Sequence, residues 1–531
     1  MNKRGRKSAE RFRRQFGTVP DVHYFPEDMV HIRSYFDFRR DQGRDPFLLD
    51  EITWNDLEGD DLFRRVNPGL TTSGEQYLYY MLRSPAQDKA TYETRRSLVD
   101  LMGREEGLRV KLQVILSRLG RARRADLCGA FYPAERGPGW LLVYLALVLA
   151  VIAAVCALPF GKGQAAMVLI LLLSANAGLH EFRLRRIQQD FATVNYTVGM
   201  AQTLERIRKL KRPELDRWLD GGYAALDELR SVLRVGALPA MTDSGGPGDL
   251  LTTLLLLDLI AYEFLKNKLG RCHEAVFAVH QELGRLDAAI AVASYRSSLE
   301  RWTEPELDFC GDSAHLEAKG LVHPLLAEAV PNDFTAGGPL LITGSNASGK
   351  STYLKAVAWN AVLAQTICTC TAERYAASVF RIYTSMALQD DLGAGESYYI
   401  VETRSLKRIL DAAAEGGAVL CAVDEVLRGT NTVERIAAAS AVLETLADRG
   451  VLCLAATHDG ELTSLLSGRY TQGHFTERLE GDEIFFDYRL RPGPAATRNA
   501  IELLRIMGVD GAVVDRARRR AAGYLDTGQW S

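Results

Sequence analysis

The sequence predicts a multidomain protein of the α plus α/β class, with a helical region first and an α/β domain after it. Three observations support this prediction. Residues 47–130 and 183–304 have the apolar spacing of helices, and an uncharged apolar segment lies between them. From residue 305 onward, short apolar runs alternate with segments long enough for helices, which is typical of a parallel sheet covered by helices.

The composition is that of an ordinary globular protein, with 47% hydrophobic residues, 25% charged residues and a net charge of −3. The overall charge therefore gives no indication of a nucleic-acid binder. Positive charge is concentrated at the N-terminus, where Glu10 is the one acidic side chain among many basic ones in residues 1–16. We predict a basic N-terminal arm over residues 1–46. Its first sixteen residues are expected to be a solvated, mobile tail, with the alternative that this tail contacts anionic lipid or phosphate.

Two apolar runs predict a transmembrane helical hairpin over residues 139–182. The first run, residues 140–158, is nineteen residues long without a charge. As a helix it would span about 28 Å, close to the thickness of a bilayer core. A second run at 165–179 follows a short turn. The alternative is a hairpin buried in a soluble core, which would normally have a polar face that the first run lacks.

The charges around this hairpin predict its orientation. Arginines lie on both outer flanks, whereas the tip carries only Lys162. By the positive-inside rule, both outer ends are cytoplasmic. The sequence therefore predicts a multi-pass protein of the cell membrane with two membrane helices and a cytoplasmic α/β domain.

A nucleotide site is indicated near the start of the α/β domain. The apolar run at 339–343 predicts a buried strand, and it leads into Gly-Ser-Asn-Ala-Ser-Gly-Lys-Ser before a helix. This is the P-loop pattern in its strand–loop–helix context, where backbone N–H groups surround phosphate oxygens. Lys350 is expected to reach the β- and γ-phosphates of ATP, and Ser351 is expected to bind Mg²⁺. The predicted ATP-binding residues of this loop are Gly344, Ser345, Asn346, Ala347, Ser348, Gly349, Lys350, Ser351 and Thr352.

Two further predicted strands, 418–423 and 451–456, end in polar residues that complete the chemistry. Asp424 and Glu425 follow the first of them. A carboxylate at this position can hold Mg²⁺, and the next carboxylate can polarise the attacking water, so we assign Asp424 to the metal and Glu425 to general-base catalysis. His458 follows the second strand, where it can contact the γ-phosphate.

These segments resemble the MutS family of ABC-class P-loop ATPases, which act in DNA mismatch repair. The resemblance covers about residues 47–130 and 185–525. It rests on segments that occur in the family's order: residues 330–333 (VPND), 344–352 (GSNASGKST), 390–402 (DDLGAGESYYIVE), 424–435 (DEVLRGTNTVER), 456–462 (ATHDGEL) and 488–509. Residues 49–85 resemble the start of the family's helical core domain.

The resemblance adds roles that the residues alone do not. Ser397 corresponds to the signature serine that reaches the γ-phosphate in the partner subunit, which implies a homodimer through the ATPase domains. Asn332 lies in the segment that lines the adenine pocket, and His458 corresponds to a switch histidine. The late helices of residues 305–531 resemble a dimerisation segment. Leu427 departs from the pattern, because the family usually has a glycine there.

The resemblance also implies a short, membrane-anchored member that lacks the mismatch-recognition domain, because fewer than fifty residues precede position 47. The expected function is that of a dimeric MutS-like ATPase using ATP and Mg²⁺, with DNA as a possible partner near the membrane. The alternative is a membrane-anchored ABC-class ATPase that acts on a partner other than DNA or as a transporter component. Against a transporter, only two membrane segments are predicted.

Overall fold

The computed structural model describes residues 3–123, 125–133, 139–236, 247–311, 313–335, 337–345, 348–386, 398–427, 430–480, 483–495 and 500–527. Its internal contacts divide the chain into two units. Unit 1 comprises Met1–Arg44, Val66–Tyr80 and Leu98–Tyr295, and unit 2 comprises Asp45–Arg65, Met81–Ser97 and Arg296–Ser531. The division differs from the predicted boundary near residue 305, since two short segments of the predicted helical region group with the α/β part.

All secondary-structure elements among the described residues of unit 1 are helices. They are α1 (Lys3–Gln15), α2 (Pro26–Gln42), α7 (Glu106–Leu119), the 3-10 helix η1 (Gly129–Phe131), α8 (Trp140–Ala157), α9 (Lys162–Arg208), α10 (Pro213–Glu228), α11 (Arg230–Gly236), α12 (Pro247–Leu254) and α13 (Leu257–Arg271). Four helices contain residues of both units: α4 (Gly59–Val66), whose last residue Val66 belongs to unit 1, α5 (Thr72–Leu82), α6 (Lys89–Arg104) and α14 (His273–Ser298).

The prediction of a solvated, mobile tail at the N-terminus is wrong for α1, and the following helix α2 is also packed into unit 1. Ala9 and Phe12 on α1 are buried in a cluster with Val110 and Val114 of α7. On α2, Tyr35 is fully buried and packs edge-on against aromatic rings of unit 1. The basic residues of α1 occupy one face of an amphipathic helix whose apolar face is covered, which charge counting alone does not reveal.

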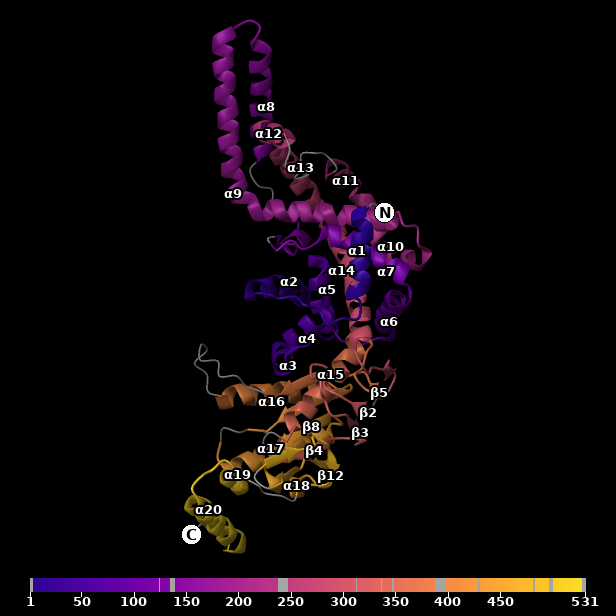
Figure 1. Ribbon diagram of the computed structural model, residues 1–531, viewed down its shortest axis with the longest axis vertical. Coiled ribbons are helices and arrows are strands. Elements are labelled where there is room, and N and C mark those ends of the chain that lie inside the picture. The colour runs from indigo at the N-terminus through magenta and orange to yellow at the C-terminus, as the bar shows by residue number, and fades with distance from the viewer. Residues whose placement is uncertain are drawn as a thin grey trace. The chain divides into compact units, whose positions relative to one another are not determined.

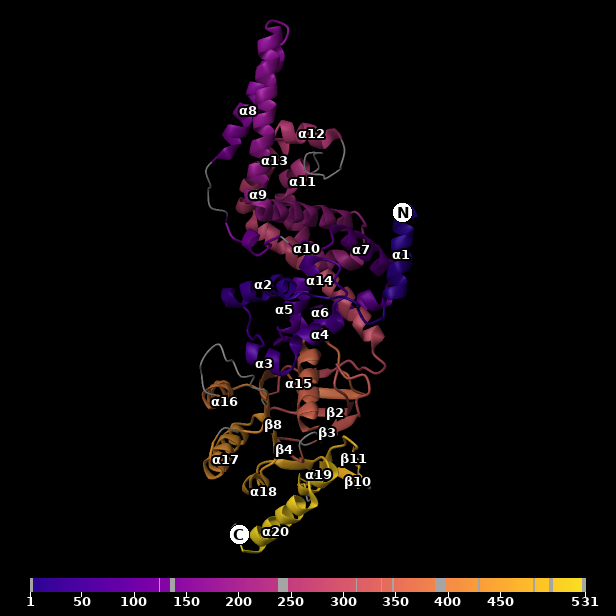
Figure 2. The same cartoon turned by 60° about the vertical axis from the view of Figure 1, so that its left-hand side comes forward.

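The apolar segment forms a helical hairpin in which α8 packs against the first part of α9 (Figures 1 and 2). Both helices are long and apolar enough to cross a membrane by length and composition. Only 17% of the apolar window in α8 and 11% of that in α9 are buried. Since the core helix of a soluble protein is mostly buried, this exposure disfavours the alternative of a hairpin inside a soluble core. The second helix is longer than predicted, because α9 continues without a break to Arg208.

Unit 2 is an α/β unit with a six-stranded sheet in the order β12-β9-β4-β8-β7-β6, a four-stranded sheet in the order β1-β5-β2-β3, and the hairpin β10-β11. The strands are β1 (Glu306–Asp308), β2 (Leu316–Leu321), β3 (Asn332–Phe334), β4 (Leu340–Thr343), β5 (Arg374–Ser378), β6 (Arg381–Ser385), β7 (Val419–Asp424), β8 (Leu452–Thr457), β9 (Thr471–His474), β10 (Glu477–Glu480), β11 (Glu483–Phe486) and β12 (Arg491–Pro492). Its helices are α3 (Glu51–Asp56), α4 (Gly59–Val66), α15 (Lys350–Ile367), α16 (Tyr398–Ala414), α17 (Thr432–Asp448), α18 (Gly460–Leu465), α19 (Ala500–Ile506) and α20 (Gly511–Thr527).

The prediction of a mostly parallel sheet is confirmed. Strands β6, β7, β8, β4 and β9 are parallel to one another, and the edge strand β12 pairs with β9 in the antiparallel direction. All residues of β4, β7 and β8 are buried, as expected for central strands covered on both faces. The register pairs Thr343 with Thr457 and Asp424 with Ala456, so the carboxyl ends of these three strands meet at one edge of the sheet.

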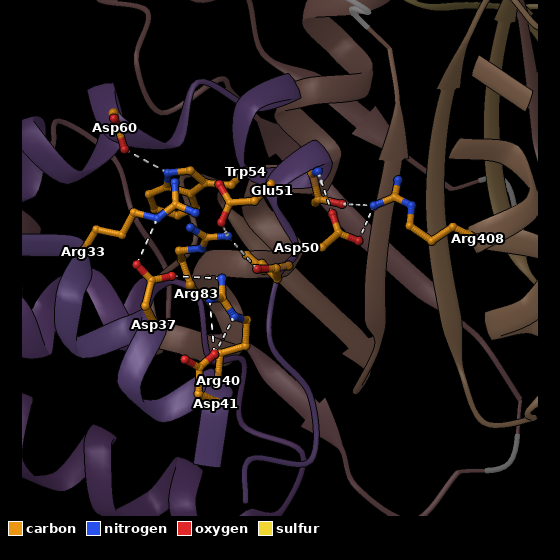
Figure 3. A network of polar contacts seen from close by, with 12 residues as sticks. Arg33, Asp37, Arg40, Asp41, Asp50, Glu51, Trp54, Asp60, Arg83 and Arg408 are labelled. Atoms are coloured by element: carbon orange, nitrogen blue, oxygen red, sulfur yellow. Dashed lines mark hydrogen bonds and ion pairs between the residues drawn. The ribbon is translucent and has the colours of Figure 1, made fainter. Parts of the chain in front are cut away.

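Residues 45–65 belong to unit 2 because polar contacts hold α3 against β6 and α15. The buried carboxylate of Asp56 accepts hydrogen bonds from Thr384 Oγ1 at 2.7 Å and from the backbone N–H of Met386 at 3.0 Å. The indole N–H of Trp359 donates to the carbonyl oxygen of Leu57 at 2.7 Å. Figure 3 shows the neighbouring ion pair between Arg408 and Asp50, the N-cap residue of α3.

Replacing Asp56 with alanine is expected to lower the free energy of unfolding by about 3 kcal/mol, because two buried donors lose a charged acceptor. Asp61→Ala is the matched control, since Asp61 makes an exposed ion pair with Arg64 and its loss is expected to cost less than about 0.5 kcal/mol. Urea unfolding of the full chain in detergent, followed by tryptophan fluorescence, measures both. Equal midpoints for the two variants would contradict the assignment.

Candidate functional site

The loop between β4 and α15 makes a turn that glycine alone accommodates. Gly344 has φ 147° and Gly349, the N-cap of α15, has φ 104°. Both values lie where a side chain is strained. A Cβ atom on Gly344 would come within 2.9 Å of the carbonyl oxygen of Phe475. The glycines of the predicted P-loop are therefore required by its backbone conformation and by the close approach of a neighbouring segment.

Positive charge and unused hydrogen-bond donors collect inside this turn. Lys350 is buried, and its ammonium group donates to the carbonyl oxygens of Gly344 at 2.8 Å and Ser345 at 2.7 Å. The hydroxyl of Ser348 is buried and has no hydrogen-bond partner among the described residues. The eighteen-residue helix α15 adds the positive end of its dipole at the same point. This set of groups suits an anion such as a phosphate.

A serine–carboxylate contact joins the loop to the end of the neighbouring strand β7. The hydroxyl of Ser351, in the first turn of α15, hydrogen-bonds to the carboxylate of Asp424, the last residue of β7. The Asp424 side chain is almost fully buried. A hydroxyl and a carboxylate are oxygen ligands of the kind that Mg²⁺ takes beside phosphate oxygens, so these two residues fit the predicted metal role.

Strand β8 lies between β4 and β7 in the sheet. The carboxyl end of β8, which leads into His458, therefore lies between the loop after β4 and Glu425, the residue that follows β7. The Nδ1 atom of His458 is 3.2 Å from Oε1 of Glu425. Glu425 is largely buried, with 12% of its side chain exposed, whereas His458 is 50% exposed. Asp459 is fixed by a bidentate ion pair with Arg435, at 2.6 and 3.1 Å. The two residues predicted to be catalytic are thus in contact, and the imidazole of His458 is the more exposed of the two side chains.

The backbone after Asp424 explains the departure at Leu427. Glu425 and Leu427 both have positive φ, 54° and 59°, in the left-handed region that favours glycine. Leu427 keeps this conformation although it is not glycine. Its side chain is buried in the sheet–helix core, and its backbone N–H donates to the carboxylate of Glu402 on α16. The core contacts and this hydrogen bond offset the backbone strain, which is of order 1 kcal/mol.

A pocket of about 610 Å³ opens beside the loop, and residues of the loop, Asp424 and Glu425 line it. Asn332 also lines it, but both ends of its amide are engaged. Its Nδ2 donates to the carbonyl oxygens of Val330 and Tyr488, and its Oδ1 accepts from the backbone N–H of Leu490. Asn332 therefore holds the segment that carries Tyr488 at the pocket wall.

Several pocket residues were not predicted from the sequence. Tyr488 presents an aromatic ring beside Gly349, and Phe475 and His323 also line the pocket. Burial lowers the pKa of His323 to about 4, so its imidazole is neutral at pH 7. On the hairpin β10-β11, Glu477 accepts a hydrogen bond from Ser345 Oγ at 2.8 Å. Tyr488 begins the segment 488–509 that carries part of the resemblance, but the sequence assigns it no role, and the other three residues lie outside those segments; the fold brings all four to the site.

The predicted residues Gly344, Ser345, Ser348, Gly349, Lys350, Ser351 and Thr352 are all found at the loop or the first turn of α15. Asn346, Ala347 and Ser397 lie outside the described residues, so their predicted roles in ATP binding stay predictions.

The fold and this site define a class of α/β domains that carry a phosphate-binding loop between a buried parallel strand and a helix. Comparison with known families makes the assignment narrower. The family model described as MutS domain V matches residues 340–524. The α/β part of the chain therefore contains a MutS domain V.

Curated relatives support the same assignment. The DNA mismatch repair protein MutS of Natronomonas pharaonis is 35% identical over 278 residues, which are 50% of this chain and 32% of that protein. The DNA mismatch repair protein MutS of Thermus aquaticus is 39% identical over 201 residues, which are 37% of this chain and 24% of that protein. The chain therefore aligns with about a third or less of the length of these relatives.

Gly344→Ala is expected to destabilise the chain by about 2 kcal/mol, because the new Cβ meets the Phe475 carbonyl and the backbone is held at positive φ. Gly468→Ala is the control, since a Cβ there meets no atom within 4 Å. Thermal unfolding of both variants in detergent tests this. If Gly344→Ala and Gly468→Ala have the same melting temperature, the loop geometry is wrong.

Proposed function

We propose that this chain is a MutS-like ATPase that binds ATP with Mg²⁺ at the loop of residues 344–351 and hydrolyses it. The observation that carries the proposal is the convergence on one pocket of the Lys350 ammonium, the Ser351–Asp424 pair and Glu425. His458 contacts Glu425 but is not among the residues that line this pocket. No purely structural role accounts for a buried ammonium, a buried hydroxyl without a partner among the described residues, and two adjacent carboxylates at one sheet edge.

Each residue has a distinct task in this proposal. Lys350 exchanges its two carbonyl contacts for the β- and γ-phosphate oxygens. Magnesium, bound by Ser351 and Asp424, would neutralise phosphate charge as the phosphoryl group transfers. Glu425 accepts a proton from the attacking water, and its contact with His458 positions it beside a side chain that can reach the γ-phosphate.

The base of the nucleotide has a candidate partner in Tyr488. Its ring lines the pocket, and the amide of Asn332 fixes its backbone. An aromatic face in this position suits stacking on adenine. Asn332 then acts as a positioning residue, because its own hydrogen-bonding groups are used within the protein.

We also propose that the chain acts as a homodimer, with Ser397 completing the site of the partner subunit. The helices α19 and α20 support this, since Met507 and Val513 expose apolar side chains there. The relatives' names include DNA mismatch repair, which supports DNA as a partner. Membrane anchoring through α8 and α9 is supported by their length, their apolar composition and the low burial of both windows.

The alternative proposal keeps the ATPase and the anchor but replaces DNA by another partner, including a transporter component. The chain aligns with the relatives mainly over the ATPase part. The alignment therefore supports the ATPase more directly than it supports DNA as the partner.

Lys350→Ala is expected to weaken Mg-ATP binding at least about tenfold, because the phosphates lose a charge-assisted contact. Glu425→Gln is expected to keep ATP binding and to lower turnover by about 100-fold or more, because the general base is removed. Lys407→Ala, at an exposed ion pair on α16, is the control and should change neither. Nucleotide titration and phosphate release by the full chain in detergent separate binding from turnover, and an unchanged rate in Glu425→Gln would refute the catalytic assignment.

If DNA is the partner, mismatched or branched DNA is expected to change the ATPase rate, and DNA retention should weaken steeply as salt rises. Rates measured with no DNA, homoduplex, mismatched and branched DNA test this. A rate that is the same in all four conditions, with no DNA retained at low salt, would leave the alternative partner as the remaining reading.

A further inference from the structure

A line of polar contacts joins α9 to the end of α12 and to α13 at the base of the hairpin. The partners on α9 follow the spacing of one helix face, and those on α12 and α13 advance in the same direction, so α13 runs parallel to α9 there. The pairs are Asn176 with Leu254, His180 with Asp258, Arg183 with Glu263, and Asp190 with Lys266. These contacts fix the position of α13 along the axis of α9. In both views α12 and α13 lie beside the base of the hairpin (Figures 1 and 2).

The uppermost pair lies within the apolar run of α9. Asn176 is completely buried, and its Nδ2 donates to the carbonyl oxygen of Leu254 at 2.8 Å. Leu254 is the last residue of α12, where the helix breaks before α13 and leaves carbonyl groups without helical partners. A free carbonyl is costly at the depth of a bilayer, and so is an unpaired amide in a membrane helix. The hydrogen bond satisfies the Leu254 carbonyl and the Nδ2 donor of Asn176, whereas Asn176 Oδ1 is buried without a hydrogen-bond partner among the described residues.

The corner between α12 and α13 exposes apolar side chains at this height. Leu251 on α12 is 61% exposed, and Leu257 at the start of α13 is 37% exposed. The hairpin itself also exposes apolar side chains, among them Leu149 and Ile152 of α8.

Groups typical of a membrane interface lie further from the hairpin tip than Asn176, by two turns of α9. Trp140 begins α8, and the guanidinium of Arg183 lies over its ring at 4.4 Å and donates to Tyr144 Oη at 2.9 Å. Tryptophan, tyrosine and arginine concentrate where hydrocarbon meets headgroups. The corner at Leu254–Leu257 is therefore on the hydrocarbon side of this belt, because its partner Asn176 precedes Arg183 by two turns of α9.

We propose that the α12–α13 corner is a third membrane-contacting element, which inserts Leu251 and Leu257 into the acyl-chain boundary of the cytoplasmic leaflet. The inference rests on the proposed membrane anchoring by α8 and α9. The corner does not cross the bilayer. It lies in the interface as a short helical wedge, held at its depth by the Asn176 amide, and the lipid it contacts is the acyl chain next to the headgroup.

Photo-crosslinking in proteoliposomes tests the proposal on the full chain. The photoreactive amino acid benzoylphenylalanine is placed singly at Leu251 or Leu257, with Leu149 as the hairpin position and the exposed Val433 of unit 2 as the background position. The probe is a phosphatidylcholine and phosphatidylglycerol vesicle, and mass spectrometry identifies the adducts. We expect lipid adducts at Leu149, Leu251 and Leu257, and only background at Val433.

The outcomes separate the inference from the anchor on which it rests. Adducts at Leu149 without adducts at Leu251 and Leu257 overturn the inference and leave the anchor in place. Background at all four positions overturns the anchor as well. Adducts from Leu251 or Leu257 to a second copy of the chain, in place of lipid, also overturn the inference.

A substitution in the hairpin tests whether the Asn176 amide holds the α12–α13 corner at its depth. Asn176→Leu keeps α9 apolar but removes the amide that holds the Leu254 carbonyl. We expect the lipid adduct at Leu257 to fall while the adduct at Leu149 is retained. If Asn176→Leu leaves both adducts unchanged, the amide does not set the depth of the corner, and that part of the inference fails.

Discussion

The hydrogen bond between Ser351 and Asp424 is the contact on which the proposed chemistry depends. It joins the first turn of α15 to the end of β7, two elements that meet only because β8 pairs with both β4 and β7. The glycine turn before α15 aims Lys350 and the helix N-terminus at the same point. Glu425 follows Asp424 directly, so the position of one carboxylate determines the position of the other. Binding of a ligand that separates Ser351 from Asp424 would therefore also shift the end of β7 and the contact of Glu425 with His458.

The chain combines this site with a region of different physical character. The sheet of unit 2 is buried on both faces, whereas the hairpin of unit 1 leaves most of its apolar windows exposed. Water is a poor solvent for such a surface, and a bilayer is a good one. The charges at the hairpin base are paired along one face of α9, which would allow polar side chains to approach the bilayer without being left unpaired.

Much of the α/β part could be predicted from the sequence because its signals are local. Each of the strands β4, β7 and β8 is a short apolar run that ends in a polar motif, and the parallel topology brings those ends together. Other features were not predictable in this way. Tyr488 and Glu477 follow the glycine-rich loop by more than a hundred residues, and nothing in the sequence around them indicates that they lie beside it. The N-terminal helix α1 was misjudged because its charges are evident in the sequence, whereas the partner of its apolar face, α7, lies far along the chain. Likewise, the placement of α3 depends on the buried Asp56, which has no pattern of its own.

The central claim is that Ser351 and Asp424 bind magnesium together with a nucleotide. Calorimetric titration of ATP into the full chain in detergent, with and without Mg²⁺, measures this directly when Asp424→Asn is compared with the unmodified chain. The account predicts that Mg²⁺ strengthens ATP binding to the unmodified chain and has little effect on Asp424→Asn. Equal ATP affinity with and without Mg²⁺ in the unmodified chain would contradict it.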